Sequence, residues 1–137
     1  MRFLLDNNLS PHLARGLHAL SQGQHQSIEV RHLRDLCPGP PPDTIWLAGL
    51  KTHGDGQWFV VSIDKFRKQA KAERVAIQRA GHVVYVLDPS WSSAGYWPQA
   101  ANLPLWWPTL LVHASVTSGG VYRIPWRRGT AGKLTAI

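Results

Sequence analysis

The chain has 137 residues, the length of one ordinary domain, and 44% of them are hydrophobic, enough to build a core. Fifteen Lys and Arg against eight Asp and Glu give a formal net charge of +7, which favours a polyanionic partner such as nucleic acid. The single cysteine excludes an intrachain disulfide, and the absence of a signal peptide pattern or a bilayer-length apolar run predicts a cytoplasmic protein with no membrane partner.

The first part of the chain predicts two short strands joined by a helix. The apolar run at residues 2–5 predicts a buried strand. Ser10 and Pro11 form a helix start, and leucines at helical spacing extend this helix to about residue 21. The polar residues 22–27 predict a loop, and residues 28–31 predict the second strand.

The middle of the chain predicts two more helices on either side of its clearest strand. Residues 33–42, with four prolines, predict a loop, after which Asp43 is well placed to cap a helix. The run from Trp58 to Ile63 predicts a buried strand, and residues 65–80 a helix that a glycine ends.

The remaining residues continue this alternation. Residues 82–87 predict a strand that Asp88 and a proline end, and residues 90–99 an aromatic, turn-like segment. A helix is predicted from Pro104 or Pro108 to Thr117, and a last short strand over residues 121–124. Such alternation is typical of an α/β fold with a mostly parallel sheet. We expect one domain over residues 1–126 and a basic tail over residues 127–137.

Three aspartates stand where a strand or a turn ends. Asp6 follows three apolar residues, Asp64 follows the strand at residues 58–63, and Asp43 follows three prolines. In an open parallel sheet, ligands bind beyond the carboxyl ends of the strands. Because clustered carboxylates repel each other, a hard cation such as Mg²⁺ or Mn²⁺ is the common way to hold them ionised. The pattern predicts a metal site, although each aspartate can also be a turn or helix-cap residue.

Two neutral polar residues accompany these acids. Ser62 points to the same side of its strand as Asp64, where it can hold a carboxylate or a water, or can be a tolerated strand residue. Asn8 can be a neutral member of the site or a turn residue. We interpret Asp88 mainly as the start of a turn. The seven histidines show no metal-ligand spacing.

The helix over residues 65–80 is the main basic element of the chain. A stripe of basic residues beside Asp64 would steer a phosphate backbone toward a metal site, and an ordinary solvated helix face is the alternative. Its five bases are Lys65, Arg67, Lys68, Lys71 and Arg74. Five of the seven tryptophans lie past residue 90, which favours core packing or an interface over base stacking.

Four segments, in this order, resemble the PIN-like nuclease domains, specifically a small bacterial subfamily that opens with an FLLDENLP-type motif. They are MRFLLDNNLSPHLARGL, VRHLRDL, PPDTIWLAG and FVVSIDKF, and together they span roughly residues 1–90. The resemblance implies a three-layer α/β/α sandwich around a mostly parallel sheet. It also implies metal-dependent hydrolysis of RNA by clustered acidic residues.

Carried over by position, the resemblance makes Asp6, Asp43 and Asp64 the acidic set and Asn8 and Ser62 its secondary polar members. Many relatives are the toxin half of bacterial toxin–antitoxin pairs. The implied partners are therefore an RNA substrate and a cognate antitoxin protein, and a homodimer is a further expectation.

Two departures from the subfamily pattern motivate an alternative. Asn7 stands where the subfamily often has Glu, and the acid often found just after Asp64 in a D-x-D arrangement is missing. Three carboxylates support a two-metal mechanism less well than four. The alternative is a catalytically weakened PIN-like module that binds nucleic acid or protein. A receiver-like signalling domain ranks last, because it would need adjacent acids where Asn7 stands and a Thr or Ser where Asp88 stands.

Overall fold

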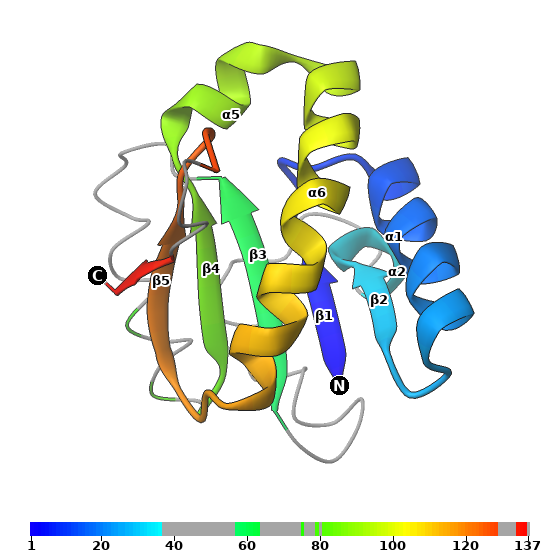
Figure 1. Cartoon of the computed structure of the whole chain (residues 1–137), viewed down its shortest axis with the longest axis vertical. Coiled ribbons are helices and arrows are strands. Elements are labelled where there is room, and N and C mark those ends of the chain that lie inside the picture. The colour runs from blue at the N-terminus through cyan, green and yellow to red at the C-terminus, as the bar shows by residue number, and fades with distance from the viewer. Residues whose placement is uncertain (37–56, 64–74, 76–78, 80, 129–133, 137) are drawn as a thin grey trace.

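The computed structural model describes residues 1–36, 57–63, 75, 79, 81–128 and 134–136. The strands in these residues form one six-stranded sheet of order β2-β1-β3-β4-β5-β6, parallel except where β6 pairs with β5 (Figure 1). This confirms the predicted α/β class with a mostly parallel sheet. The elements are β1 (Arg2–Leu5), α1 (Pro11–Gln24), β2 (Glu29–His32), α2 (Leu33–Leu36), β3 (Trp58–Ile63), β4 (Val83–Leu87), α5 (Pro89–Ala94), α6 (Tyr96–Ser115), β5 (Gly120–Ile124) and β6 (Thr135–Ala136).

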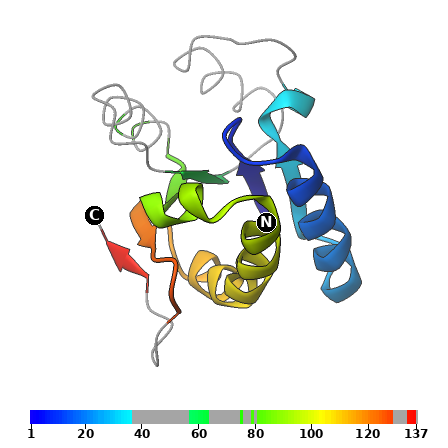
Figure 2. The ribbon, with the colours of Figure 1, turned by 90° about the horizontal axis from the view of Figure 1, so that it is seen from above.

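Helices α1 and α6 lie on the same side of the sheet (Figure 2). Alternate strand residues such as Phe3 and Phe59 pack with Leu13 of α1 and Trp106 of α6 in the larger buried cluster. The intervening strand residues form a second cluster on the other face, where Leu33 of α2 joins them. The predicted helices that begin at Asp43 and Lys65 fall outside the described residues, although Val75 and Arg79, described singly, are helical.

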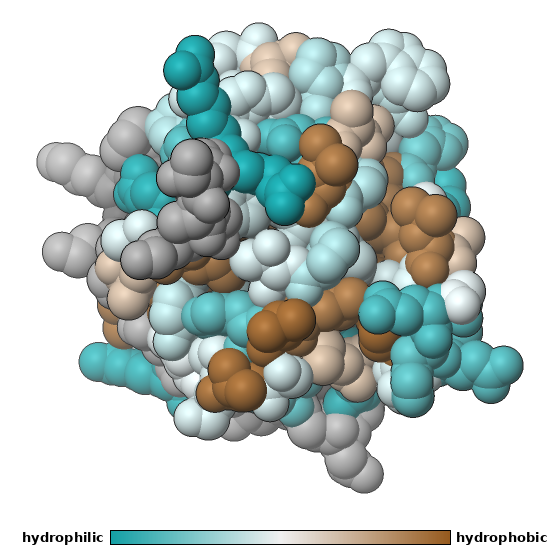
Figure 3. Space-filling model, in the orientation of Figure 1, coloured by the Kyte–Doolittle hydropathy of each residue, from teal (hydrophilic) through white to brown (hydrophobic). Residues whose placement is uncertain are grey.

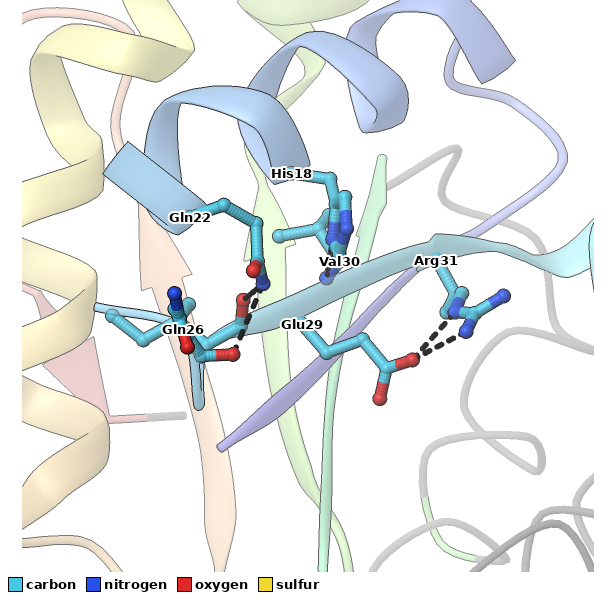
Figure 4. A network of polar contacts seen from close by, with 7 residues as sticks. His18, Gln22, Gln26, Glu29, Val30 and Arg31 are labelled. Atoms are coloured by element: carbon cyan, nitrogen blue, oxygen red, sulfur yellow. Dashed lines mark hydrogen bonds and ion pairs between the residues drawn. The ribbon is translucent and has the colours of Figure 1, made fainter. Parts of the chain in front are cut away.

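The connection from α1 to β2 is closed by side chains of α1 (Figure 4). Gln22 Nε2 donates to the carbonyl oxygens of Gln26 at 3.2 Å and Ile28 at 2.7 Å. His18 Nδ1 accepts a hydrogen bond of 3.1 Å from the Val30 amide. These bonds hold the last turns of α1 against β2. The helix therefore extends to Gln24, three residues beyond the predicted end, and the predicted loop is shorter.

The helix predicted from Pro104 or Pro108 to Thr117 is present but begins earlier and ends at Ser115, and the turn-like interpretation of residues 90–99 was wrong. Asp88 caps the short helix α5, and α6 then begins at Tyr96 and contains Pro104 and Pro108 in its interior. An interior proline removes one backbone hydrogen bond and normally bends or ends a helix. Here the helix continues because it buries a large apolar face against the sheet. The buried residues are Leu103, Trp106, Trp107, Leu110, Leu111 and Ala114.

Smaller differences lie in the short elements, and among them β4 begins one residue later and β5 one residue earlier than predicted. Residues 33–36, predicted as loop, form the single turn of α2, and β2 lies one residue later than predicted. Thr135 and Ala136, predicted as part of the tail, pair antiparallel with β5. Strands β1 and β3 have the predicted bounds. Among the described residues, the structure contains no helix that is both long and apolar enough to cross a membrane.

Candidate functional site at the carboxyl ends of β1 and β3

Asp6 lies directly past the carboxyl end of β1. Its amide donates to the Val61 carbonyl at 3.0 Å, which continues the pairing of β1 with β3 by one residue. The preceding Leu4 and Leu5 are completely buried, whereas Asp6 itself is only partly buried. The strand therefore delivers this carboxylate to the edge of the sheet where ligands of parallel α/β folds bind.

Two donors from different elements orient the Asp6 carboxylate. Oδ1 accepts a hydrogen bond of 2.7 Å from the Asn7 amide, and Oδ2 accepts one of 2.9 Å from Ser62 Oγ on β3. Each carboxylate oxygen has two lone pairs, so each keeps one for a further ligand. The turn interpretation of Asp6 is thus correct, and it leaves the carboxylate able to bind a cation.

Asn8 joins the loop after β1 to the last residue of β3. Its Nδ2 donates to the Ile63 carbonyl at 3.2 Å, and its Oδ1 accepts from the Ile63 amide at 3.5 Å. The side-chain amide thus makes the pair of hydrogen bonds that the backbone of a neighbouring strand would make with Ile63. Both of its polar atoms contact backbone, so Asn8 fixes the ends of β1 and β3 relative to each other.

His32 supports the same loop from the other side, and sequence reasoning missed it. It is the last residue of β2, is completely buried, and pairs in register with Leu5. Its Nδ1 accepts from the Arg34 amide at 3.1 Å, so the ring proton is on Nε2, which donates to the Leu9 carbonyl at 2.7 Å. The Leu9 amide in turn donates to the Asp6 carbonyl at 3.0 Å. Because β2 has the sequence EVRH, with only one apolar residue, no apolar run in the sequence marks His32 as a buried strand end.

Asp88 has a structural role at the end of β4. Its Oδ1 accepts from the Ser90 amide at 2.9 Å and caps α5, and its Oδ2 accepts from the Trp126 amide at 3.1 Å. Both oxygens therefore bind backbone, in agreement with its interpretation as a turn residue.

The structure brings Asp6, Asn8 and Ser62 together. The other predicted site residues lie outside the described residues: Asp43, Asp64, Lys65, Arg67, Lys68, Lys71 and Arg74. Over the parts of the chain that are described, no group of three or more His, Cys, Asp or Glu side chains could hold a metal ion. The oxygen donors around Asp6 are nevertheless of the kind that Mg²⁺ and Mn²⁺ prefer, so Asp6 fits one position of such a site.

Comparison with protein families gives a match to the family described as the PIN-like domain, over residues 1–89. This span is more than half of the chain and runs from β1 through β4. It contains Asp6, Asn8, His32 and Ser62. Comparisons with curated proteins and with solved structures give no match.

Proposed function

The chain belongs to the PIN-like domain family, whose members are generally nucleases, and from this premise we propose that it is a metal-dependent ribonuclease. The observation that carries the proposal is the Asp6 carboxylate, held at the carboxyl edge of the sheet by donors from Asn7 and Ser62. The net charge of +7 supports an RNA substrate. The FLLDENLP-type opening supports the further proposal that the protein is the cytoplasmic toxin of a bacterial toxin–antitoxin pair, inhibited by a cognate antitoxin.

In the proposed mechanism, Asp6, Asp43 and Asp64 would hold Mg²⁺ or Mn²⁺. When bound, the ion would neutralise charge on the attacked phosphate and lower the pKa of the attacking water. Ser62 and the Asn7 amide keep the Asp6 oxygens in one orientation, so the carboxylate does not have to reorganise during the reaction. Asn8 holds both backbone polar groups of Ile63, the residue that precedes Asp64 in the chain.

The basic residues of the segment at 65–74 have a separate role in this proposal. Lys65, Arg67, Lys68, Lys71 and Arg74 would bind the phosphate backbone on either side of the cleaved bond. Such contacts position RNA without reading its sequence, so cleavage should weaken as salt concentration rises.

The test is cleavage of a panel of RNA oligonucleotides with Mg²⁺ or Mn²⁺. We expect Asp6→Asn to reduce the rate by about a hundredfold or more, because one ligand of the ion loses its charge. Asp35→Asn is the matched control, since Asp35 lies on α2 and its carboxylate pairs with Arg15 at 3.7 Å, outside the site. Equal rates for Asp6→Asn and wild type, or no cleavage with either ion, would exclude the proposal.

The second candidate function is a PIN-like module that binds nucleic acid or protein without cutting. The observation that favours it is the basic residue Lys65 after Asp64, in the region where the subfamily often has another acid. Calorimetric titration with Mn²⁺ separates the two candidates. Binding that Asp6→Asn removes supports the nuclease, whereas no binding by the wild-type protein supports the module.

A further inference from the structure

A groove with an apolar floor and a basic rim lies between α6 and the residues that follow β5. It has a volume of about 480 Å³, and its walls are Pro98, Ala101, Asn102 and Leu105 on the helix and Trp126, Arg127 and Arg128 on the other side. Both arginines are exposed. The face in Figure 3, which is the face of α6, shows hydrophobic surface beside hydrophilic side chains.

The wall formed by Trp126 is fixed in place. The Trp126 amide donates to Asp88 Oδ2 at 3.1 Å, and its carbonyl accepts from Asn102 Nδ2 of α6 at 2.8 Å. The ring packs edge-on against the completely buried ring of Trp91, with 4.8 Å between centroids. Because the backbone and the ring of Trp126 are both held, the groove is formed before a partner binds. Binding therefore loses little conformational entropy in ordering this wall.

The outer face of α6 is unusually apolar for a surface helix. Its twenty residues, all of them described, include no Asp, Glu, Lys or Arg. Trp97 is 76% exposed, Leu105 55% and Val112 69%. The exposed face of a surface helix normally carries charged and polar residues. Exposed apolar side chains beside arginines and tryptophan are instead the composition of protein interfaces.

We propose that this groove binds an acidic amphipathic segment of another protein. Apolar side chains of the segment would cover Leu105 and the floor, while its carboxylates would pair with Arg127 and Arg128 at the rim. Bidentate pairing of arginine with carboxylate gives such a contact both strength and orientation. The groove lies on α6 and beside β5, with β3 and β4 between β5 and β1, which carries Asp6, so the proposal does not depend on nuclease activity.

Charge and shape favour this occupant over two others. A second copy of the chain would bring another +7 of net charge, and its α6 offers no carboxylate to pair with the arginines. Single-stranded nucleic acid binds by stacking its bases on aromatic faces in a basic groove. Here the helix wall is Pro98, Ala101, Asn102 and Leu105, with no aromatic side chain, and the Trp126 ring already contacts Trp91.

The experiment is fluorescence anisotropy of the full chain with labelled probes. The main probe is a helical peptide of about 14 residues with leucines along one face and glutamates elsewhere, the helix-in-groove mode. A peptide with lysines in place of the glutamates, a peptide with serines in place of the leucines, and a uridine-rich RNA of similar length are the comparisons. Among the three peptides, we expect only the acidic, leucine-bearing one to bind tightly, and any RNA binding should not depend on Arg127 and Arg128.

Variants then assign the binding to the groove. Leu105→Ser and the double variant Arg127→Ala/Arg128→Ala should each weaken binding by about tenfold, and the double variant should also reduce its salt dependence. Val112→Ser, on the same helix but outside the groove, and Arg15→Ala, on α1, should leave affinity unchanged. Asp6→Asn should also leave it unchanged, so loss of nuclease activity and loss of the groove are distinguishable.

Several results would overturn the proposal. Equal binding of the glutamate and lysine peptides would remove charge complementarity as its basis. RNA binding that requires Arg127 and Arg128, without peptide binding, would assign the groove to nucleic acid. Self-association in sedimentation that Leu105→Ser abolishes would assign it to a second copy. Circular dichroism of each variant checks folding, which substitution of the half-exposed Leu105 should preserve.

Discussion

Ser62 Oγ on β3 donates a hydrogen bond of 2.9 Å to Asp6 Oδ2 at the end of β1. The bond crosses between adjacent parallel strands, so it links the orientation of the Asp6 carboxylate to the sheet itself. In the proposed metal site, Ser62 would orient the Asp6 ligand without binding the ion, and removing such a partner commonly changes metal affinity by about 10- to 100-fold.

We therefore predict that Ser62→Ala weakens Mn²⁺ binding by about tenfold or more. The free energy of unfolding should change by only about 1 kcal/mol, because one partly exposed hydrogen bond is lost. Ser62→Thr keeps the hydroxyl and should retain most of the affinity. Titration calorimetry measures the affinity and urea unfolding the stability. An affinity equal to that of wild type would show that the bond does not orient a metal ligand.

His32 provides a prediction on stability. Replacing this completely buried side chain by leucine removes the donor to the Leu9 carbonyl and the acceptor of the Arg34 amide. Two polar backbone groups lose their partners, which should cost about 2–4 kcal/mol of unfolding free energy. His12→Ala, at an exposed position of α1, is the control and should cost under about 1 kcal/mol.

The same variant tests the link between His32 and Asp6. The Leu9 amide donates to the Asp6 carbonyl, so loosening Leu9 should also weaken Mn²⁺ binding in His32→Leu at temperatures where the variant remains folded. Stability loss with unchanged metal affinity would restrict His32 to a role in the core.

The sequence predicts well those parts of the fold whose secondary structure is determined by a single effect, such as the hydrophobic pattern of a strand. Strands β1 and β3 are continuous apolar runs, as expected for parallel strands covered on both faces, and their bounds match the prediction. Helix α6 differs because two effects compete. Pro104 and Pro108 oppose the helix locally, and burial of its aromatic face outweighs them, which only the tertiary structure reveals.

In the candidate site, too, part of the arrangement depends on tertiary structure and cannot be predicted from the sequence. The position of Asp6 at a strand end follows from the sequence, but its partner does not. In the sequence, Asp64 is the acidic residue nearest to Ser62. The hydrogen bond of Ser62 to Asp6 arises because β1 and β3 are neighbours in the sheet, although 52 residues separate Leu5 from Trp58, the first residue of β3. Chain order cannot give strand order, because parallel strands are joined by crossovers. The roles of Asp43, Asp64 and the basic stripe stay predictions.

A pH-dependent prediction concerns His113 on α6. Burial lowers the pKa of the His113 imidazole from its ordinary value of 6.5. The Tyr85 hydroxyl and His113 Nδ1 share a hydrogen bond of 2.8 Å, and burial, together with the neighbouring Tyr122, raises the pKa of the Tyr85 hydroxyl. Because its pKa is lowered in the folded protein, His113 stays neutral there to a lower pH than it does in the unfolded chain.

The sign for stability follows from proton binding. As the pH falls through 6.5, the unfolded chain takes up a proton at His113 more readily than the folded chain, so folding loses free energy. We predict that wild type loses more stability than His113→Gln between about pH 7.5 and pH 5, measured by urea unfolding at each pH. Comparing the two proteins cancels the other titrating groups, and equal losses would exclude the effect.

Pro108 provides a test of the competition within α6. Its ring nitrogen cannot donate to the Pro104 carbonyl four residues earlier, and its side chain is exposed, so Pro108→Ala restores a helix hydrogen bond without opening a cavity. Replacing an interior proline gains up to about 3 kcal/mol of helix propensity, from which about 1 kcal/mol is lost because the unfolded chain becomes more flexible. We predict a net gain of about 1–2 kcal/mol in unfolding free energy.

Pro98→Ala is the matched control, since Pro98 lies in the first turn, where an amide has no partner within the helix. It should give no gain, and a gain of equal size at both positions would show that the effect does not arise from the hydrogen bond missing in the interior of the helix.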